Sequence, residues 1–388
     1  MATSDIPDLR HREFSRILII KPSAVGDVVH TLPVLDKLRR RYPEARIDWL
    51  LTPENAQIVR GHPGVSNILL FARRDFGRNG RRMGAVASLV RLVREIRRAR
   101  YEMVIDLHGQ MRSAFFALAS GAGVRIGFDR PIGRGASSFQ GRRLGNIAQR
   151  GWAGAREGSW LAYTHRIGIP TLEVHAVDRY LWVGDLLGFD TEAPVFELAV
   201  SAEAEGRVAA LLAPRMSVGQ RLAVLVPGTM WETKHWTEEG FAGVARRLNE
   251  SGFAPIIIGT KEEQGLNHSI HARAPGSVDF TGQTTLADVV ALIRRAAVVV
   301  TNDSGAMHIA AALGKPAVSI FGPTNPVQVG PYGQPGSVVR LNLPCSPCNF
   351  RRLSQCPHGH ACMQDLPAEM VMERVREVLE ADVTKSLL

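Results

Sequence analysis

Short apolar runs alternate with longer amphipathic stretches along the first half of the chain. The runs have the length of buried strands, and the stretches between them repeat apolar residues every three or four positions, as a helix does. The predicted strands cover 16–21, 46–51, 68–71, 103–107 and 124–128, and the predicted helices cover 28–43 and 83–99. Strands that alternate with helices predict βαβ units, and therefore a parallel sheet with helices on both faces.

The same alternation starts again in the second half. Residues 129–160 interrupt it, because they are rich in Gly and Arg and predict a basic loop, and a helix is expected at 175–189. Residues 190–220 are irregular, so we place a domain junction there. Later strands are predicted at 222–228, 255–260, 298–303 and 317–324, with helices at 241–252, 286–296, 305–314 and 367–383.

These patterns predict the fold class and the domains. We expect an α/β protein with two Rossmann-like, doubly wound domains and a cleft between them. The domains cover 1–190 and 220–366, and a C-terminal helix and tail follow at 367–388. In such sheets ligands bind beyond the carboxyl ends of the strands, so the loops after the strands are the places to look for chemistry.

Composition adds an excess of positive charge. The 388 residues include 47 Lys and Arg against 37 Asp and Glu, a formal net charge of +10. That excess predicts an anionic partner: nucleic acid, a phosphorylated substrate or an acidic membrane surface. The hydrophobic content of 45% excludes a disordered chain. No apolar run approaches about 18 residues, and the N-terminus lacks a secretory signal, so we expect a cytoplasmic protein.

All four cysteines lie in one short segment near the C-terminus. Cys345, Cys348, Cys356 and Cys362 have the spacing C-x2-C-x7-C-x5-C. Clustered thiols in a chain that otherwise lacks cysteine predict a tetrahedral structural metal, zinc or iron. Disulfides and a redox-active cluster are the alternatives, and a cytoplasmic chain argues against disulfides. His358 and His360 lie within this segment and could replace one of the cysteines as a ligand.

Three loops carry candidate chemistry. In the first, KPSAVGD, Ser23 and Gly26 suit a close approach of the backbone to a ligand. Asp27 then stands at a helix start, where it is either a general base for an acceptor hydroxyl or only an N-cap. In the second, VPGTMWETKHW, Thr229 and Lys234 offer a hydroxyl and a positive charge to a phosphate, unless the lysine is merely solvated.

The third loop is TNDSGAMHIAAALGKP. Asp303, Ser304 and Gly305 fall at a strand-to-helix junction, where backbone amides bind anions. His308 falls on the first turn of that helix, where it either faces the same ligand or has a structural role. The chain has no G-x-G-x-x-G or Walker sequence, which argues against a nicotinamide enzyme and a P-loop ATPase.

The motifs KPSAVGDVVHTLP, VIDLHGQMRS, TKHW and TNDSGAMHIAAALGKPAVSIFGPT, in this order, resemble glycosyltransferase family 9 over residues 16–380. This is the family of bacterial ADP-heptose:lipopolysaccharide heptosyltransferases. The resemblance implies a GT-B fold, and an inverting enzyme that moves a heptose from ADP-heptose to Kdo or the first heptose of the lipopolysaccharide inner core. The HTLP and KHW strings favour the type that adds the first heptose to Kdo.

The resemblance also implies roles for single residues. Asp27 matches the general base, and Thr229 and Lys234 match residues that hold the diphosphate. Asp303, Ser304, Gly305 and His308 match a D-[TS]-G-x-x-H loop that contacts heptose and phosphates. Glu262 or Glu263 falls where the ribose is held, and Thr284 to Leu286 fall near the adenine. With Lys234 and two amide-lined turns at the leaving diphosphate, no catalytic metal is expected.

The charge excess has a matching use in this reading. The acceptor would be Kdo-lipid A or a core oligosaccharide, an anionic lipid on the cytoplasmic face of the inner membrane. A basic face could dock there as a peripheral contact, or it could be a solvated helix face. Its residues are Arg73, Arg74, Arg78, Arg81, Arg82, Arg91, Arg94, Arg97, Arg98 and Arg100.

Four other functions stay open at this point. A nucleotide-sugar epimerase on the same fold would need an acid–base pair at the sugar, and only Asp27 is evident. A protein-modifying heptosyltransferase would share the donor motifs and the cysteine cluster. A basic nucleic-acid-binding protein with a metal clip would suit the charge, but its aromatics should alternate with the arginines, and they do not. A catalytically silent scaffold is disfavoured by the intact Asp27 and Lys234.

Overall fold

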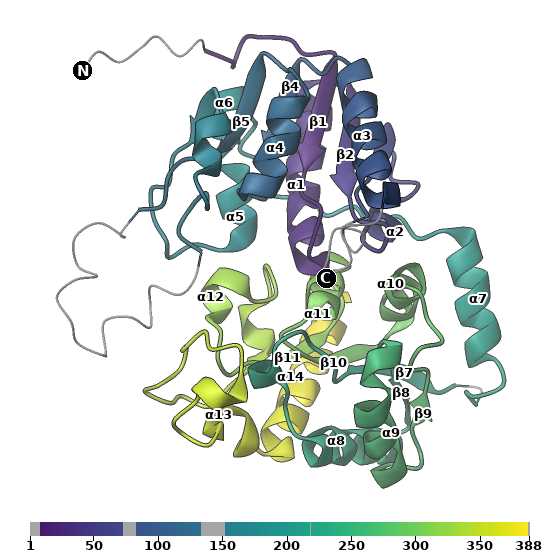
Figure 1. Cartoon of the computed structure of the whole chain (residues 1–388). Helices are drawn as coiled ribbons and strands as arrows, with labels where there is room; N and C mark the ends of the chain where they lie inside the picture. Colours follow the sequence, from purple (N-terminus) through teal and green to yellow (C-terminus); the bar gives the residue numbers. More distant parts are fainter. Residues whose placement is uncertain (1–7, 73–82, 133–151, 218, 387–388) are drawn as a thin grey trace. The chain divides into compact units, whose positions relative to one another are not determined.

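The computed structural model describes residues 8–72, 83–132, 152–217 and 219–386 (Figure 1). The described chain divides into two compact units. Residues up to 199 form the first unit, and residues from 200 onward form the second.

The first unit is built on a parallel six-stranded sheet. Its strands lie in the order β3-β2-β1-β4-β5-β6, so β1 is central, and Ile20 at its end pairs with Leu50 of β2 and Asp106 of β4. The four residues after Arg16 in β1 are fully buried, as expected of an apolar strand covered on both faces. The strands are β1 (Arg16–Ile20), β2 (Arg46–Leu51), β3 (Asn67–Leu70), β4 (Met103–Asp106), β5 (Val124–Phe128) and β6 (His165–Ile167).

Helices of the first unit pack on this sheet through apolar stripes. Leu92 and Ile96 of α3 and Phe116 of α4 form one buried cluster with Leu18 and Ile20 of β1, so α3 and α4 cover the same face. On α1, Pro33 lies inside the helix, and α1 packs against α5. The helices are α1 (Val25–Arg41), α2 (Ala56–Val59), α3 (Met83–Arg98), α4 (Met111–Ala119), the short 3-10 turn η4 (Ser159–Ala162), α5 (Ala176–Leu181) and α6 (Gly184–Leu187).

The second unit repeats the strand order of the first. Its parallel sheet runs β12-β11-β10-β7-β8-β9, so each sheet, numbered from its own first strand, has the order 3-2-1-4-5-6. This is the Rossmann order, in which the carboxyl ends of strands 1 and 4 flank the ligand edge. The strands are β7 (Arg221–Val226), β8 (Phe253–Ile257), β9 (Val278–Asp279), β10 (Val298–Asn302), β11 (Ala317–Ile320) and β12 (Val338–Val339).

The C-terminal helix α14 (Ala368–Ser386) belongs to the core of the second unit. Its Val371 and Val375 are buried in one cluster with Phe241 and Leu248 of α8 and Ile320 of β11. The other helical segments are α7 (Ala202–Leu212), η5 (Glu232–Lys234), α8 (Glu238–Glu250), η6 (Lys261–Glu263), α9 (Gln264–Arg273), α10 (Leu286–Arg295), α11 (Gly305–Ala312), α12 (Pro326–Val329), η7 (Pro335–Ser337), η8 (Leu353–Gln355) and α13 (Ala361–Gln364).

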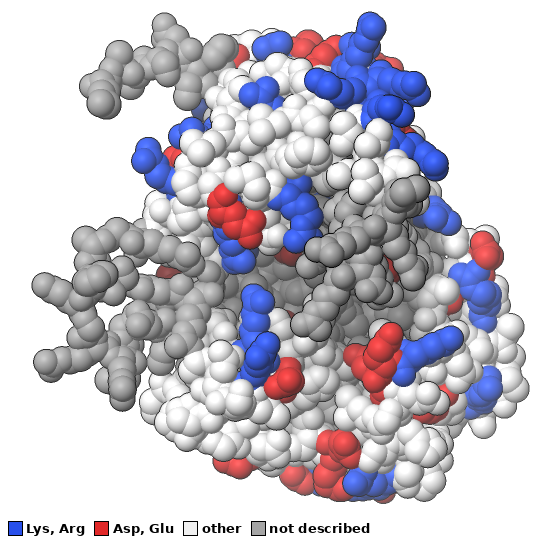
Figure 2. All heavy atoms as spheres, viewed as in Figure 1, with Lys and Arg blue, Asp and Glu red and all other residues white. Residues whose placement is uncertain are grey.

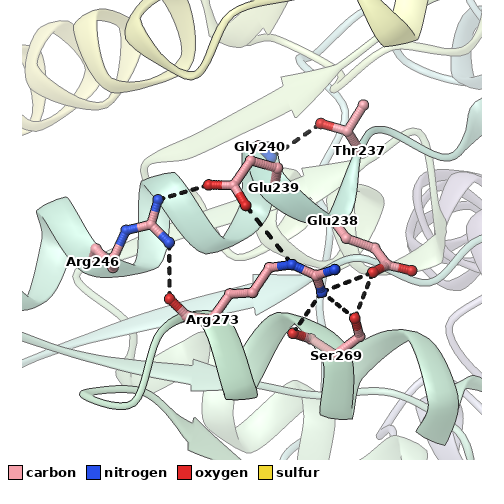
Figure 3. Close-up of polar contacts among 7 residues, drawn as sticks. All are labelled: Thr237, Glu238, Glu239, Gly240, Arg246, Ser269 and Arg273. Atoms are coloured by element: carbon pink, nitrogen blue, oxygen red, sulfur yellow. Dashed lines mark hydrogen bonds and ion pairs between the residues drawn. The ribbon is translucent and has the colours of Figure 1, made fainter.

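Polar contacts join α8 to α9 on the surface of the second unit (Figure 3). The Arg273 guanidinium lies 3.0 Å from Glu238 and 3.8 Å from Glu239. Arg246 donates to Glu239 at 2.8 Å and to the Arg273 carbonyl at 2.8 Å. These side chains are largely exposed, so the network ties two helices together without contributing much stability.

Several segments differ from what the sequence predicts. Residues 190–220 contain the helix α7, whose buried face has only Ala204, Val208 and Leu212, a stripe too sparse to stand out in the sequence. The helix expected at 175–189 is two short helices, α5 and α6. The edge strand β6 was not expected, because its sequence HRI is polar. Among the described residues, no helix is both long and apolar enough to cross a bilayer.

Candidate active site

Asp27 lies in the first turn of α1, just beyond the carboxyl end of the central strand β1. The N-cap of this helix is Ala24, so the alternative in which Asp27 itself is the N-cap is wrong. Its Oδ2 instead accepts a hydrogen bond from the Ala24 amide at 3.2 Å. This contact uses one carboxylate oxygen and leaves the other for different partners, and 37% of the side chain is exposed.

Two side chains hold the second carboxylate oxygen of Asp27. The Tyr180 hydroxyl donates to Oδ1 at 2.7 Å, and the Lys21 ammonium lies 3.5 Å from the same atom. Lys21 is almost fully buried, donates to the Leu107 carbonyl at 3.0 Å, and lies 4.6 Å from the centre of the Tyr180 ring. Asp27 is therefore fixed by Lys21 just after β1, by Tyr180 of α5 and by the N-cap of its own helix.

These contacts set the charge state of Asp27. Burial acts to raise its pKa, but the Lys21 charge and the Tyr180 hydrogen bond outweigh burial and lower the pKa to about 2. Burial lowers the pKa of Lys21, although Asp27 acts in the opposite direction. The carboxylate is thus ionised at neutral pH, as a proton acceptor must be, and it is a weak base while these contacts persist.

A pocket lies beside Asp27 in the first unit. It is small and is lined by Pro22, Ser23, Phe71, His108, Arg112, Ser113 and Phe116. Burial and the Lys21 charge lower the pKa of His108 to about 3, so its imidazole is neutral at pH 7. Ser23 lines this pocket, while Gly26 is buried in the first turn of α1.

In the second unit, Lys234 lies on the turn after the first strand β7, as Asp27 does in the first unit. Its ammonium is 2.7 Å from Asp303 Oδ2, and it is 4.4 Å from the centre of the Trp231 ring. The Thr229 hydroxyl donates to the Asp303 carbonyl at 3.0 Å. The predicted diphosphate residues thus meet the third loop, and Lys234 is paired with an acid in this structure.

The third loop follows β10 and begins α11. Asp303 Oδ2 also accepts the Thr324 hydroxyl at 2.6 Å, so two partners fix this carboxylate. Ser304 is the N-cap of α11, and Gly305 is its first residue. His308 is buried in the first turn. This brings Thr229, Lys234, Asp303 and the α11 N-terminus to one edge of the second sheet, and amides at a helix N-terminus favour an anion.

The two candidate ribose residues differ in their surroundings. The Glu263 carboxylate accepts the Thr260 amide at 2.7 Å and packs against the backbone of Gly228, where a Cβ would lie 1.9 Å from Glu263 Oε1. Glu262 is exposed on η6. Glu263 therefore supports the neighbouring loops, and Glu262 is the better candidate for a ligand contact. Thr284 lies just before α10, and Leu286 is its first residue.

The four cysteines are free thiols that influence one another. Burial raises the pKa of Cys362 to about 11, and the neighbouring thiols of Cys348, Cys345 and Cys356 add to that rise. Thiols are suitable donors for zinc or iron. However, within the described ranges no three His, Cys, Asp or Glu side chains are arranged to hold a metal ion. The observed side-chain positions therefore do not form a metal site.

Sequence analysis missed several residues around Asp27. Lys21 stood in the quoted motif, and a lysine at the end of an apolar strand was a signal that could have singled it out. Tyr180 and Arg179 gave no local signal, because their role depends on α5 packing against α1. Arg179 is buried with its guanidinium 4.1 Å from the Trp152 ring centre. Asp106 ends β4, buried, and accepts the Tyr163 hydroxyl at 2.8 Å.

Two units with Rossmann strand order, each with charged side chains just after its first strand, have the architecture of the GT-B fold. The model of glycosyltransferase family 9 (heptosyltransferase) matches residues 89–146 and 133–358, and the chain belongs to this family. It is therefore a glycosyltransferase enzyme. This membership does not favour the epimerase or the nucleic-acid-binding alternative.

Individual relatives agree with this assignment. Lipopolysaccharide heptosyltransferase 1 of Pseudomonas aeruginosa is 29% identical over 336 residues, which cover 86% of each chain. Two solved structures have the same fold. A family 9 glycosyltransferase from Veillonella parvula matches with a TM-score of 0.74 and 19% identity, covering 97% of this chain and 100% of the other. E. coli heptosyltransferase WaaC with ADP matches with a TM-score of 0.70 and 24% identity, covering 94% and 99%.

Proposed function

We propose that the enzyme transfers a heptose from ADP-heptose to the inner core of lipopolysaccharide, with Kdo or the first heptose as acceptor. The observation that carries the proposal is the pair of loops after β1 and β7, one with an ionised carboxylate at Asp27 and one with a cation at Lys234. The names of the relatives support the donor and the acceptor: one is a lipopolysaccharide heptosyltransferase 1, and one solved structure contains ADP.

In the proposed reaction, Asp27 accepts the proton of the acceptor hydroxyl as that oxygen attacks the anomeric carbon of the heptose. The bond from this carbon to the diphosphate oxygen breaks, and ADP leaves with the bonding electron pair. Attack on the face opposite the diphosphate inverts the anomeric centre. A carboxylate that is ionised before the reaction is ready for this step.

The second unit would hold the donor. Lys234 and the amides at the start of α11 stabilise the negative charge that grows on the leaving diphosphate. Thr229, Asp303, Ser304, Gly305 and His308 line the same edge and orient the phosphates and the heptose. Glu262 binds the ribose, and Thr284 and Leu286 lie near the adenine. Because Lys234 supplies the positive charge, activity should persist in EDTA.

The test is to incubate purified enzyme with ADP-heptose and truncated lipopolysaccharide acceptors, and to weigh the products. Addition of one heptose to Kdo-lipid A supports the proposal. Which of the truncated acceptors gains the heptose defines the type of enzyme. A protein acceptor labelled in place of the lipid would favour a protein-modifying heptosyltransferase. No transfer to any acceptor, with intact ADP binding, would contradict the proposed acceptor.

We also propose that the first unit contacts the anionic inner leaflet of the membrane, on its cytoplasmic side, as a peripheral protein. The face of α4 supports this, because Met111, Phe115 and Leu118 form one exposed apolar stripe at helical spacing. Leu161 of η4 is 74% exposed, and η4 and α3 both pack against α4. On α3, Val86 and Val90 are exposed as well.

Positive charge lies beside this apolar face. Figure 2 shows Lys and Arg side chains gathered over α3. The exposed arginines of α3 and of the two residues after it are Arg91, Arg94, Arg97, Arg98 and Arg100. The other predicted members, from Arg73 to Arg82, lie outside the described residues. Apolar side chains flanked by arginines suit a bilayer with acidic headgroups, at about 1 kcal/mol per cation near the surface.

We retain the proposal that Cys345, Cys348, Cys356 and Cys362 bind a structural zinc or iron ion. Their spacing and their mutual influence on thiol pKa values support it. Within the described residues, no group of three or more such side chains is arranged to hold a metal ion. Metal analysis of the purified protein tests the proposal: about one ion per chain is expected, and a substoichiometric content that chelators do not change would reject it.

A further inference from the structure

We infer that the cysteine segment, residues 345–362, is a brace for the turn that carries Lys234, and that Thr233 and His360 are positioning residues of the donor site. The inference rests on the proposed function, because that proposal assigns Lys234 to the diphosphate. Within the second unit, this segment contacts two turns of the ligand edge.

The first set of contacts reaches the turn 229–235. Thr233, directly before Lys234, is 1% exposed, and its hydroxyl donates to the Phe350 carbonyl at 2.6 Å. The His360 Nε2 donates to the Thr233 carbonyl at 2.7 Å. The hydroxyl and the carbonyl of Thr233 are therefore both hydrogen-bonded to the cysteine segment.

The two residues before Thr233 contact the segment as well. The Leu353 amide donates to Glu232 Oε2 at 3.1 Å. The Arg351 guanidinium lies 4.7 Å from the centre of the Trp231 ring, the ring that Lys234 also contacts. Three consecutive residues of the turn are thus held from one side, which fixes the backbone from which the Lys234 side chain extends.

A second set of contacts reaches the turn 322–324. The Asn349 amide donates to the Pro323 carbonyl at 2.7 Å, and the Ser346 hydroxyl donates to the Gly322 carbonyl. A Cβ on Gly322 would lie 2.8 Å from Cys362 Sγ, so the segment packs directly on this backbone. The next residue, Thr324, binds Asp303. The segment therefore supports both the turn that carries Lys234 and the turn whose Thr324 binds Asp303.

A brace of this kind matters because an ordered cation binds an anion more tightly than a mobile one. If the turn were mobile, binding of the donor would have to order it, and the entropy cost of that ordering would weaken the affinity. Removing the Thr233 hydroxyl also removes its hydrogen bond to the partly buried Phe350 carbonyl. The expected effect is weaker binding of ADP, without loss of the charged groups themselves.

The experiment compares Thr233→Val with Thr233→Ser in the full-length enzyme. Valine keeps the shape and removes the hydroxyl, while serine keeps the hydroxyl. Ser277→Ala is the matched control, because Ser277 is also buried in the second unit and donates to the Ala274 carbonyl at 2.7 Å. Amide hydrogen exchange over residues 229–235 reports the brace, and ADP titration reports the donor site.

We expect Thr233→Val to speed exchange in 229–235 and to weaken ADP binding about tenfold, with Thr233→Ser and Ser277→Ala near wild type. Equal exchange in all four proteins would overturn the brace. If wild type does not bind ADP but exchange still rises in Thr233→Val, the brace stands and the donor assignment fails. Should Thr233→Val not fold, His360→Phe, whose ring has no N–H, removes the other contact and is judged by the same two measurements.

Discussion

The Tyr180 hydroxyl donates a hydrogen bond to Asp27 at 2.7 Å, across 153 residues of sequence. This bond and the Lys21 charge keep the Asp27 carboxylate ionised and aimed in one direction. The same contacts lower its basicity. Tyr180 and Lys21 therefore determine both the ionisation and the base strength of Asp27.

Tyr180→Phe should raise the pKa of Asp27 from about 2 toward its ordinary value of 3.8, because a hydrogen bond to the charged form is lost. Because its lowered pKa keeps Asp27 ionised, titration of this residue should leave wild-type kcat/KM unchanged from about pH 8 down to about pH 4. The variant should show an acid limb that begins at higher pH. Identical acid limbs in both proteins would contradict the role of Tyr180.

Asp27→Ala should lower kcat by about 10²- to 10⁴-fold, the usual contribution of a general base, and leave ADP affinity unchanged. Asp129→Asn is a matched control, since Asp129 is also 37% exposed and lies 3.6 Å from a cation, Arg166. Steady-state kinetics and ADP titration check both statements. Wild-type turnover in Asp27→Ala would remove this residue from the reaction.

Lys234→Ala should weaken ADP binding and slow turnover, because the proposed charge at the diphosphate is lost. It should also lower the free energy of unfolding by roughly 3 kcal/mol, because the buried Asp303 loses its cation. The double variant Lys234→Ala with Asp303→Asn should recover much of the stability and none of the ADP binding. Recovery of ADP affinity in the double variant would show that Lys234 serves only to neutralise Asp303.

Vesicle sedimentation tests the proposed membrane face. Wild type should bind vesicles that contain acidic phospholipid more strongly than neutral vesicles, and less so at high salt. Replacing Phe115 and Leu118 together by Ser should reduce binding at least about tenfold, because two apolar side chains no longer enter the lipid. Met230→Ser is the control, since Met230 is 88% exposed but lies in the second unit. Equal binding to neutral and acidic vesicles would reject the proposal. It would also be rejected if the Phe115 and Leu118 variant changed its oligomeric state but bound vesicles as wild type does.

Arg351→Ala and Arg352→Ala remove the same charge from neighbouring positions of the cysteine segment. Arg351 stacks on Trp231, so its loss should weaken ADP binding more than the loss of Arg352. The comparison separates contact with the Trp231 turn from long-range electrostatics, which both variants alter. ADP titration at two salt concentrations measures it, and equal losses in the two variants would assign the effect to charge alone.

Much of the fold could be predicted from the sequence because buried parallel strands are apolar throughout. β1 (RILII) and β7 (RLAVLV) are such strands, and each is the first strand of its unit. Short polar elements such as β6 and sparse helices such as α7 could not be found, since their stability comes from tertiary packing. The expected cleft between the domains stays a prediction.

The candidate site was predictable where it lies on loops that follow strands. Asp27, Lys234 and Asp303 stood out because each follows an apolar run at the edge where ligands bind. Tyr180 could not be found, because nothing near it in sequence indicates a partner on α1. The role of the cysteine segment was hidden for the same reason: its thiols attracted attention, whereas its carbonyl at Phe350 and its imidazole at His360 make the contacts with the turn.

The position of Trp231 has a practical consequence for following this enzyme in solution. Its indole lies 4.4 Å from the Lys234 ammonium and 4.7 Å from the Arg351 guanidinium, and indole emission is sensitive to nearby charge. An anion that draws either cation away should alter the fluorescence of this ring. The protein therefore carries a built-in optical reporter for nucleotide, which Trp231→Phe would silence while leaving the other five tryptophans of the chain as background.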